Sequence, residues 1–429
     1  MIKQLIAIWI GKIIFHVSRA TLKGGGSAAP GLIGLKIAPK LLDSLLPQIP
    51  TQVIITGTNG KTTTARLLNH FATTQGIKVI RNATGSNLER GIASTLIAKT
   101  DLFGKLKTDL AIWELDEAAF NKLAPKIKPQ IVVILNVFRD QLDRYGEVDT
   151  VVKNWQQTLA KLDQDKTVLL LNGDDPNIVS LKKAFKGKIE FFGIPSNKYK
   201  AESSQTSTQS KNFKAEKVTT QGLDSTKFEL HFANQRPSVT LPIPGIYHIY
   251  DFLASFSAGY HLNLNTAQML NSLKDYSPAF GRVEKLNLGG KEALMFLIKN
   301  PIGASLVFET IAQKIEPKDT LFFALNDNFA DGTDVSWIWD AEIERLQAAG
   351  YSGRLICSGT RAQDMALRLK YAGFDPKNIK LEEDLAQALK LAQDQTNSKL
   401  FILPTYTAML ELQKILVKTG IKKHYWREG

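Results

Sequence analysis

A glycine-rich turn between an apolar run and a helical pattern has residue types that suit phosphate binding. The β-branched run 53–56 leads into Gly57-Thr58-Asn59-Gly60-Lys61-Thr62-Thr63, and residues 64–71 then follow a helical pattern. Backbone N–H groups of such a turn bind anionic oxygens, the lysine reaches the outer phosphates, and the first threonine hydroxyl can ligate magnesium. The usual spacing of this motif places a glycine where Ile55 stands. Because glycine, lysine and threonine are all in register, an ordinary βα turn is the weaker interpretation. We expect these seven turn residues to bind ATP.

Strands and helices alternate from residue 52 to about 180, which predicts a parallel sheet with helices on both faces. Polar residues follow the expected strands, and ligands of such sheets bind at the carboxyl ends of strands. Turn or cap chemistry explains any one of these clusters, but not their recurrence. The expected strands cover residues 77–80, 110–117, 131–136 and 167–171.

Two sets of polar residues at these strand ends have expected roles. Glu114 and Thr62 are the expected magnesium ligands, because hard cations prefer oxygen. A second interpretation of Glu114, as a buried acid paired with Arg139, remains open. Asn172, Asp174 and Asp175 are expected to close over the base and ribose of the nucleotide.

Composition is typical of a globular protein with two or three domains: 429 residues, 44% hydrophobic and 22% charged. The net charge of +13 and a pI near 9.5 favour an anionic partner. Nucleic acid is the weakest choice, because no basic stripe with interleaved aromatic residues is present. Cys357 is the only cysteine, which excludes a disulfide framework and a cysteine zinc site. We therefore expect a cytoplasmic protein.

The N-terminal segment 2–20 is apolar but interrupted by basic residues. On a helical wheel Lys12, His16 and Arg19 lie opposite a set of large apolar side chains, namely Ile2, Ile6, Trp9, Ile10, Ile13, Ile14 and Val17. The apolar run is too short to cross a bilayer. Two interpretations remain open: an interfacial helix on an anionic cytoplasmic leaflet, and a helix packed on the core of the protein.

The alternation of strands and helices resumes after about residue 287, which predicts a second, smaller Rossmann-like domain. Strands are expected at 294–298, 320–325, 354–357 and 400–403, and helices at 304–315, 337–348, 361–371 and 382–393. The acidic cluster 326–340 follows the second of these strands.

Four of these motifs resemble the ATPase core of the Mur ligases: residues 57–64, 136–146, 172–176 and 281–284. Within that superfamily, residues 326–340 and Lys299-Asn300-Pro301 are similar to the MurT family, the ligase-like subunits of lipid II isoglutaminyl synthases. The resemblance covers nearly the whole chain and implies that Asn136 and Arg282 also contact the nucleotide. We expect no UDP-binding N-terminal domain like that of ordinary Mur ligases.

The chain departs from its resembled relatives at three places. Many relatives carry a four-cysteine zinc ribbon, whereas residues 201–224 are polar and lack cysteine, so we expect no zinc and a hairpin or loop there. Gln141 stands where ordinary Mur ligases have histidine. His248 and Asp251 stand where asparagine is frequent, which leaves the contacts with the base undefined.

The resemblance implies an α/β fold with three parts. These are an N-terminal amphipathic helix and linker at 1–46, a P-loop Mur ligase-type domain at 47–286 with a polar insert at 196–226, and a Rossmann-like domain at 287–429. It also implies ATP, Mg²⁺ and ATP-dependent amidation of the D-glutamate α-carboxyl of lipid II. Lys61 and Glu114 would act in the ligase reaction, at the inner face of the plasma membrane.

Ammonia for that reaction would come from a GatD-like glutaminase subunit, docked on the C-terminal domain. By resemblance, Asp334 completes a Cys–His pair on that subunit, where its carboxylate would fix the histidine tautomer. As an alternative, Asp334 caps the helix expected near Trp337. A free-standing amino-acid ligase of the folylpolyglutamate type and a non-catalytic ATP-binding scaffold at the membrane are the alternative functions.

Overall fold

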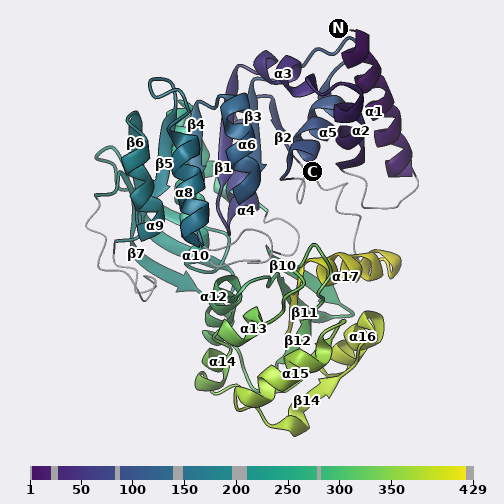
Figure 1. The fold of residues 1–429 in the computed structure, drawn as a ribbon. Coiled ribbons are helices and arrows are strands. Elements are labelled where there is room, and N and C mark those ends of the chain that lie inside the picture. The colour runs from purple at the N-terminus through teal and green to yellow at the C-terminus, as the bar shows by residue number, and fades with distance from the viewer. Residues whose placement is uncertain are drawn as a thin grey trace.

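The structure, a computed structural model, describes residues 2–20, 28–82, 87–138, 148–195, 210–277 and 282–421, without the side chains of Arg19, Ala20 and Arg282. It contains two β-sheets, each covered by its own helices (Figure 1). The first sheet has nine strands and the second has six.

The first sheet has the order β2-β3-β1-β4-β5-β6-β7-β8-β9 and is parallel from β2 to β7. Its parallel strands are continuous apolar runs because helices bury both faces. The parallel strands are β1 (Thr51–Thr56), β2 (Val79–Arg81), β3 (Leu110–Leu115), β4 (Ile131–Ile134), β5 (Val168–Asn172) and β6 (Lys188–Gly193).

Alternate residues of β1 contact different helices. Val53 and Ile55 belong to a core cluster that includes α4 (Lys61–Thr73) and α10 (Tyr247–His261), whereas Ile54 belongs to a second cluster that includes α5 (Glu89–Lys99), α6 (Glu117–Ile127) and α8 (Val148–Leu159). All three β1 side chains are fully buried. Shorter helices complete this half of the molecule: α3 (Leu41–Leu45), η2 (Leu46–Gln48), α9 (Pro176–Ser180), η3 (Leu181–Ala184), α11 (Thr266–Ser272) and η4 (Leu273–Asp275).

An antiparallel extension completes the first sheet, which is therefore mixed rather than wholly parallel as expected. It consists of β7 (Phe213–Gln221), β8 (Ser225–His231) and β9 (Ser238–Leu241). The described part of the expected polar insert, residues 210–226, forms β7 and the start of β8. Residues 196–209 lie outside the described part of the chain.

The second sheet has the order β10-β11-β15-β12-β13-β14, with only β10 and β11 antiparallel. The expected domain boundary at residue 287 falls inside β10. The strands are β10 (Arg282–Leu288), β11 (Lys291–Phe296), β12 (Thr320–Ala324), β13 (Arg354–Ser358), β14 (Ile379–Leu381) and β15 (Leu400–Pro404). The sequence patterns did not predict β10 or β14.

Longer and shorter helices lie around this sheet (Figure 1). They are α12 (Pro301–Ala312), α13 (Trp337–Asp340), α14 (Glu344–Ala348), α15 (Ala362–Tyr371), α16 (Leu385–Gln395) and α17 (Tyr406–Lys418), with η5 at Pro376–Asn378. The prediction of one helix over 337–348 was wrong, because the chain becomes extended at Ala341. The last helix, α17, was not predicted.

The N-terminal helix α1 (Ile2–Ala20) packs beside α2 (Ala29–Ile37) and α5, next to the β2 edge of the first sheet (Figure 1). Ala7 and Ile8 of α1 are buried in the core, so the interpretation of a packed helix is confirmed for this face. The expectation of a basic face on this helix is partly wrong. The Lys12 ammonium does not belong to such a face, because it donates to the carbonyls of Ala98 and Thr100 at the end of α5. Among the described residues, the length and apolar character of every helix fall short of what a membrane span requires.

Candidate active site

The glycine-rich turn joins β1 to α4 at the carboxyl edge of the first sheet. Gly57 and Gly60 have φ of +138° and +89°, conformations that strain other residues. A Cβ at Gly60 would also lie only 2.1 Å from Oδ1 of Asp251. The start of α4 has no side-chain cap, which leaves its first N–H groups pointing into the turn. This geometry fits a phosphate group.

The Lys61 ammonium lies across this turn. It donates to the carbonyl oxygens of Gly57 and Thr58, the latter at 3.1 Å, and the side chain is 9% exposed. A phosphate in the turn could take these hydrogen bonds without a large movement of the lysine. The structure therefore places Lys61 where the sequence predicted it.

Asn136, directly after β4, braces the turn by contacts with its backbone. Its Oδ1 accepts from the Asn59 N–H at 2.8 Å, and its Nδ2 donates to the Asn59 carbonyl at 3.1 Å. The Thr58 N–H donates to the Asn136 carbonyl at 3.0 Å. Asn136 therefore shapes the turn, and its expected direct contact with the nucleotide stays a prediction.

Thr62 and Glu114, the expected magnesium ligands, lie together. The Thr62 hydroxyl donates to Glu114 Oε2 at 2.8 Å, and the glutamate is fully buried. Arg81, at the end of β2, places Nη1 3.8 Å from Glu114 Oε1. The sequence patterns missed Arg81, although its position at a strand end was a usable signal; Arg139, the alternative partner, lies outside the described residues. A hydroxyl and a carboxylate on neighbouring elements are a donor set that fits Mg²⁺.

Asn172 is the last residue of β5, and Asp174 lies two residues beyond it at the same sheet edge. Asn172 Oδ1 accepts from the Asp174 N–H at 2.9 Å. Asp174 pairs with Lys211 at 3.0 Å and accepts from the Tyr250 hydroxyl at 3.0 Å. Lys211 and Tyr250 join this cluster from distant segments, so the sequence gave no local signal for them. Closure of these residues over the base and ribose stays a prediction.

Asp175 has contacts within the protein fold. Its Oδ1 caps α9 by accepting from the N–H groups of Asn177 and Ile178, and its Oδ2 accepts from Val137 at 3.0 Å. Burial raises the pKa of this carboxyl to about 6, against the opposing effect of the three N–H groups. The side chain links β4 to β5, and its expected contact with the nucleotide also stays a prediction.

His248 and Asp251 form a buried pair against the turn. His248 Nδ1 lies 2.9 Å from Asp251 Oδ2, and the Thr64 hydroxyl donates to Asp251 Oδ1 at 3.4 Å. His248 Nε2 is buried and has no hydrogen-bond partner among the described residues. Asp251 of this pair therefore takes up the space directly behind Gly60.

A pair of asparagines connects the turn to the second half of the molecule. Asn300 Nδ2 donates to Asn59 Oδ1 at 3.0 Å, and Asn59 Nδ2 donates to Asn300 Oδ1 at 3.3 Å. Asn300 also caps α12 by accepting from the Gly303 N–H at 2.8 Å. Asn300 was noted in the sequence only as part of a motif, and its contact with the turn could not be predicted from that motif.

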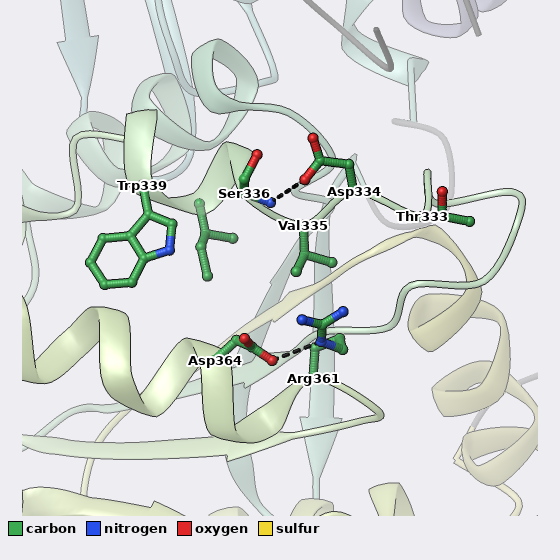
Figure 2. A pocket seen from close by; sticks show the side chains of 8 residues that line it. Thr333, Asp334, Val335, Ser336, Trp339, Arg361 and Asp364 are labelled. Atoms are coloured by element: carbon green, nitrogen blue, oxygen red, sulfur yellow. Dashed lines mark hydrogen bonds and ion pairs between the residues drawn. The ribbon is translucent and has the colours of Figure 1, made fainter. Parts of the chain in front are cut away.

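Asp334 lies on the surface of the second half, beside a pocket of about 240 Å³ (Figure 2). Its Oδ1 accepts from the Ser336 N–H at 2.8 Å, so it stabilises the turn that precedes α13. The N-cap position of α13 belongs to Ser336, which makes the alternative role of Asp334 as that cap wrong. Trp339 and Arg361 also line the pocket, and Arg361 pairs with Asp364 at 2.7 Å.

Two family signatures match most of the chain: the Mur ligase middle domain over residues 55–259 and the MurT ligase C-terminal domain over residues 297–409. The "Lipid II isoglutaminyl synthase (glutamine-hydrolyzing) subunit MurT" of Streptococcus pneumoniae (strain ATCC BAA-255 / R6) is 31% identical over 93% of this chain and 94% of its own. The subunit of the same name from Staphylococcus aureus (strain COL) is 31% identical over 95% and 96%. This chain belongs to the MurT family of the Mur ligase superfamily.

Solved structures of other Mur ligases have the same fold as this MurT family member. MurF from Thermotoga maritima, in complex with ADP, has a TM-score of 0.67 at 16% identity and covers 90% of this chain and 85% of its own. Mycobacterium tuberculosis folylpolyglutamate synthase, also with ADP, has a TM-score of 0.66 at 14% identity and covers 96% and 99%. The expected fold class is confirmed.

Two of the motifs that resemble the Mur ligase core, 136–146 and 281–284, fall partly on residues that are not described. Gln141 and Gly281 lie outside the described residues, as does the side chain of Arg282. The expected contact of Arg282 with the nucleotide stays a prediction.

One cluster of potential metal ligands lies on the hairpin of this MurT family member. Glu216, Glu229 and His231 bring three ligand atoms within 4.8 Å of one another. Lys214 pairs with Glu216 at 2.9 Å and Lys217 pairs with Glu229 at 3.0 Å, so both carboxylates already have a cation. The expectation of a zinc-free hairpin stays a prediction.

Proposed function

We propose that this chain is the ligase subunit of a lipid II isoglutaminyl synthase. It would use ATP to amidate the D-glutamate α-carboxyl of the lipid II stem peptide, forming D-isoglutamine during peptidoglycan biosynthesis. The likeness to two MurT subunits over more than nine-tenths of each chain carries the proposal. The placement of Lys61, Thr62 and Glu114 around one turn supports the use of ATP.

The chemistry requires two steps, because a carboxylate is a poor electrophile. In the first step a carboxylate oxygen attacks the γ-phosphorus of ATP, giving an acyl phosphate and ADP. Lys61 would then exchange its carbonyl partners for phosphate oxygens and stabilise the charge that develops there. Thr62 and Glu114 would hold a magnesium ion, whose charge offsets that of the phosphates. In the second step ammonia attacks the acyl carbon, and phosphate leaves with loss of a proton.

Ammonia is scarce at neutral pH, so a second subunit would release it from glutamine. The printed name of the relatives, a glutamine-hydrolysing synthase with separate subunits, supports this partner. We infer that a GatD-like glutaminase docks beside Asp334, whose exposed carboxylate could reach a histidine of that subunit. The lipid substrate also supports a position at the inner face of the plasma membrane.

A reconstituted assay tests this proposal. The purified chain, lipid II, ATP, Mg²⁺ and an ammonium salt should convert the stem peptide carboxyl to an amide, a loss of about 1 Da by mass spectrometry, with one ADP per product. Glutamine should replace the ammonium salt only when the glutaminase is present. Transfer of a free amino acid instead would identify a free-standing ligase, and no ATP turnover under any of these conditions would identify a scaffold.

A further inference from the structure

The outward face of α1 is apolar, although the helix is already packed on the protein. Five large side chains at helical spacing are between 38% and 73% exposed: Ile2, Ile6, Trp9, Ile13 and Val17. The face of α1 that packs on the protein buries fewer and mostly smaller residues, namely Ala7, Ile8 and Gly11. A helix that only completes a core turns its large apolar side chains inward. Packing on the protein therefore does not account for the outward face of α1.

Close packing fixes the orientation of α1. A Cβ at Gly11 would lie 2.9 Å from Cγ2 of Ile97 in α5, so the Ile97 side chain packs directly against Gly11 and leaves little room for a larger residue. On the same side, the Lys12 ammonium donates to the Thr100 carbonyl at 2.6 Å. Rotation that buried Ile13 would break both contacts. The apolar face therefore points outward in the folded chain.

A turn after α5 extends this face. The Trp9 indole N–H donates to the Leu102 carbonyl at 2.8 Å, which joins the helix to the turn. Leu102 and Phe103 are 64% and 80% exposed, and Asp101 Oδ1 fixes the turn by accepting from the Phe103 N–H at 2.9 Å. We call the five exposed α1 residues together with Leu102 and Phe103 the docking face.

The charged residues that flank the docking face in sequence are basic, with the exception of Asp101 in the turn. Residues 1–42 contain six lysines and arginines and no aspartate or glutamate. Lys99, Lys105 and Lys107 are exposed on either side of Phe103 in sequence. Protruding apolar side chains, an aromatic residue with a satisfied indole N–H and flanking lysines match an anionic lipid surface, whose fluid interior needs no complementary shape.

We propose that the docking face inserts into the headgroup–acyl boundary of an anionic membrane, with α1 lying in the membrane plane. The inference deepens the proposed function and rests on it only for the location of the lipid substrate. The face itself follows from the exposure, packing and charge of α1 and its neighbouring turn. In this arrangement α5 supports the inserted helix from the protein side.

Vesicle binding by the full chain tests the docking face without lipid II. Sedimentation with vesicles of phosphatidylglycerol and phosphatidylethanolamine should show binding, and pure phosphatidylcholine should bind at least about 10-fold more weakly. The double variant Ile13→Glu/Phe103→Glu should lose at least about 30-fold in affinity. Leu381→Glu, a similarly exposed apolar residue on β14, is the matched control and should bind like the parent chain. Equal binding by the double variant and the parent would overturn the proposal.

A site-specific probe gives a second measurement. Because the single cysteine, Cys357, is fully buried, Phe103→Cys can be labelled selectively with an environment-sensitive fluorophore. Its emission should shift to the blue with anionic vesicles, whereas the same label at Leu381→Cys should not respond. No shift at position 103 would overturn the proposal. It would also be overturned if the parent chain did not bind vesicles but formed a concentration-dependent dimer that Ile13→Glu abolishes.

Ligation in detergent micelles separates this inference from the proposed function. The double variant should amidate micellar lipid II at the parental rate, because it changes no residue near Lys61. A parent chain that binds vesicles but amidates nothing would contradict the proposed function and leave the docking face supported.

Discussion

Individual residues of the nucleotide turn have protein partners that ATP would replace. The Lys61 ammonium contacts two carbonyls of its own turn, and the Thr62 hydroxyl donates to Glu114. Asn136 holds the backbone of the turn from behind. The turn is therefore shaped before ATP binds, which lowers the cost of ordering it.

Lys61→Ala should abolish ligation and leave the fold intact. The lysine acts on the phosphates, and Asn136 still braces the turn without it. We expect turnover with ammonium salt to fall about 10³-fold or more, with little change in Tm. Lys122→Ala, which removes an exposed ammonium paired with Glu89, should change neither quantity. Unchanged amidation by the Lys61 variant would remove the turn from the active site.

Asp175 should make stability depend on pH in an unusual direction for an acid. Its folded pKa of about 6 lies above the unfolded value of 3.8, so the folded state binds more protons between these values. The contribution of Asp175 to the free energy of unfolding is therefore fully present below pH 4. It is lost as the pH rises through 6, and the loss is about 3 kcal/mol at most.

Asp175→Asn provides the measurement, since an amide does not titrate. Between pH 4 and pH 7, urea unfolding should show the parent chain losing stability relative to the variant. If the two free energies of unfolding change in parallel, Asp175 does not have the raised pKa.

At the scale of elements, one buried arginine explains why residues 337–348 do not form a single helix. Arg368 of α15 donates to the carbonyls of Ile338 at 2.9 Å and Ala341 at 2.8 Å. These carbonyls belong to the end of α13 and the extended residue after it. Its guanidinium also pairs with Glu344 at 2.7 Å and lies 5.6 Å from the ring centroid of Trp339. The break between α13 and α14 is thereby stabilised, and Trp339 is held at the pocket.

Arg368→Met should destabilise the fold and weaken docking of the glutaminase. Loss of the guanidinium leaves buried carbonyls without donors, at a cost of about 2–4 kcal/mol. Thermal unfolding measures the first effect, and titration calorimetry with the glutaminase measures the second. Arg354→Met is the control, because it removes an exposed arginine that also donates to a carbonyl, that of Gln395. It should have a small effect on thermal stability and on glutaminase binding. Equal effects of the two variants would mean that Arg368 has no special role.

At the scale of the whole molecule, the asparagine pair makes the second half sensitive to the nucleotide turn. Asn59 is a turn residue, while Asn300 caps the start of α12 in the second half of the molecule. We predict that occupancy of the turn and the relative position of the two halves are coupled through this contact, because a phosphate bound in the turn would also interact with the segment that holds Asn59.

Asn300→Asp should weaken this coupling and keep the helix cap. The aspartate still accepts from the Gly303 N–H but cannot donate to Asn59. Its second carboxylate oxygen would face Oδ1 of the Asn59 side chain, so two acceptors would oppose each other. We expect ligation to fall about 10-fold, with a change in the nucleotide-dependent radius of gyration measured by X-ray scattering. Asn265→Asp, at the N-cap of α11, is the matched control and should preserve both. A parental scattering response from the Asn300 variant would refute the coupling.

Asp334 should affect glutamine use and not ligation itself. Asp334→Asn keeps the side-chain volume but loses the charge that would stabilise a partner imidazolium. The corresponding change in a Ser-His-Asp enzyme lowers turnover by about 10⁴-fold, and a more reactive cysteine should give a smaller but still large loss. Glutamine-driven amidation should therefore collapse, whereas amidation with a high concentration of ammonium salt should continue. If both activities were lost, Asp334 would belong to the ligase site or to the fold. If neither were lost, its role would be limited to stabilising the turn before α13.

The sequence by itself determined the features whose signals are local. Continuous apolar runs and a Gly-Lys-Thr turn are sufficient for β1, the turn and α4, because backbone geometry and side-chain period are short-range properties. The same patterns predicted the α/β class, four of the strands in the second sheet and the region of the nucleotide site. They also predicted that Glu114 and Thr62 share one magnesium site, and the two side chains do lie together, because strand ends of a parallel sheet meet at one edge.

Tertiary structure decided the features that depend on segments distant in sequence. Lys211, Tyr250 and Arg81 reach the site only once the strands are ordered side by side, and Asn300 meets Asn59 only when the two halves pack. The break near Ala341 depends on Arg368, which supplies donors that no local sequence signal announces. The orientation of α1 was left open by its amphipathic pattern. Packing of the Ile97 side chain on Gly11 and the hydrogen bond from Lys12 to the Thr100 carbonyl decided it, and the large apolar side chains were left facing outward.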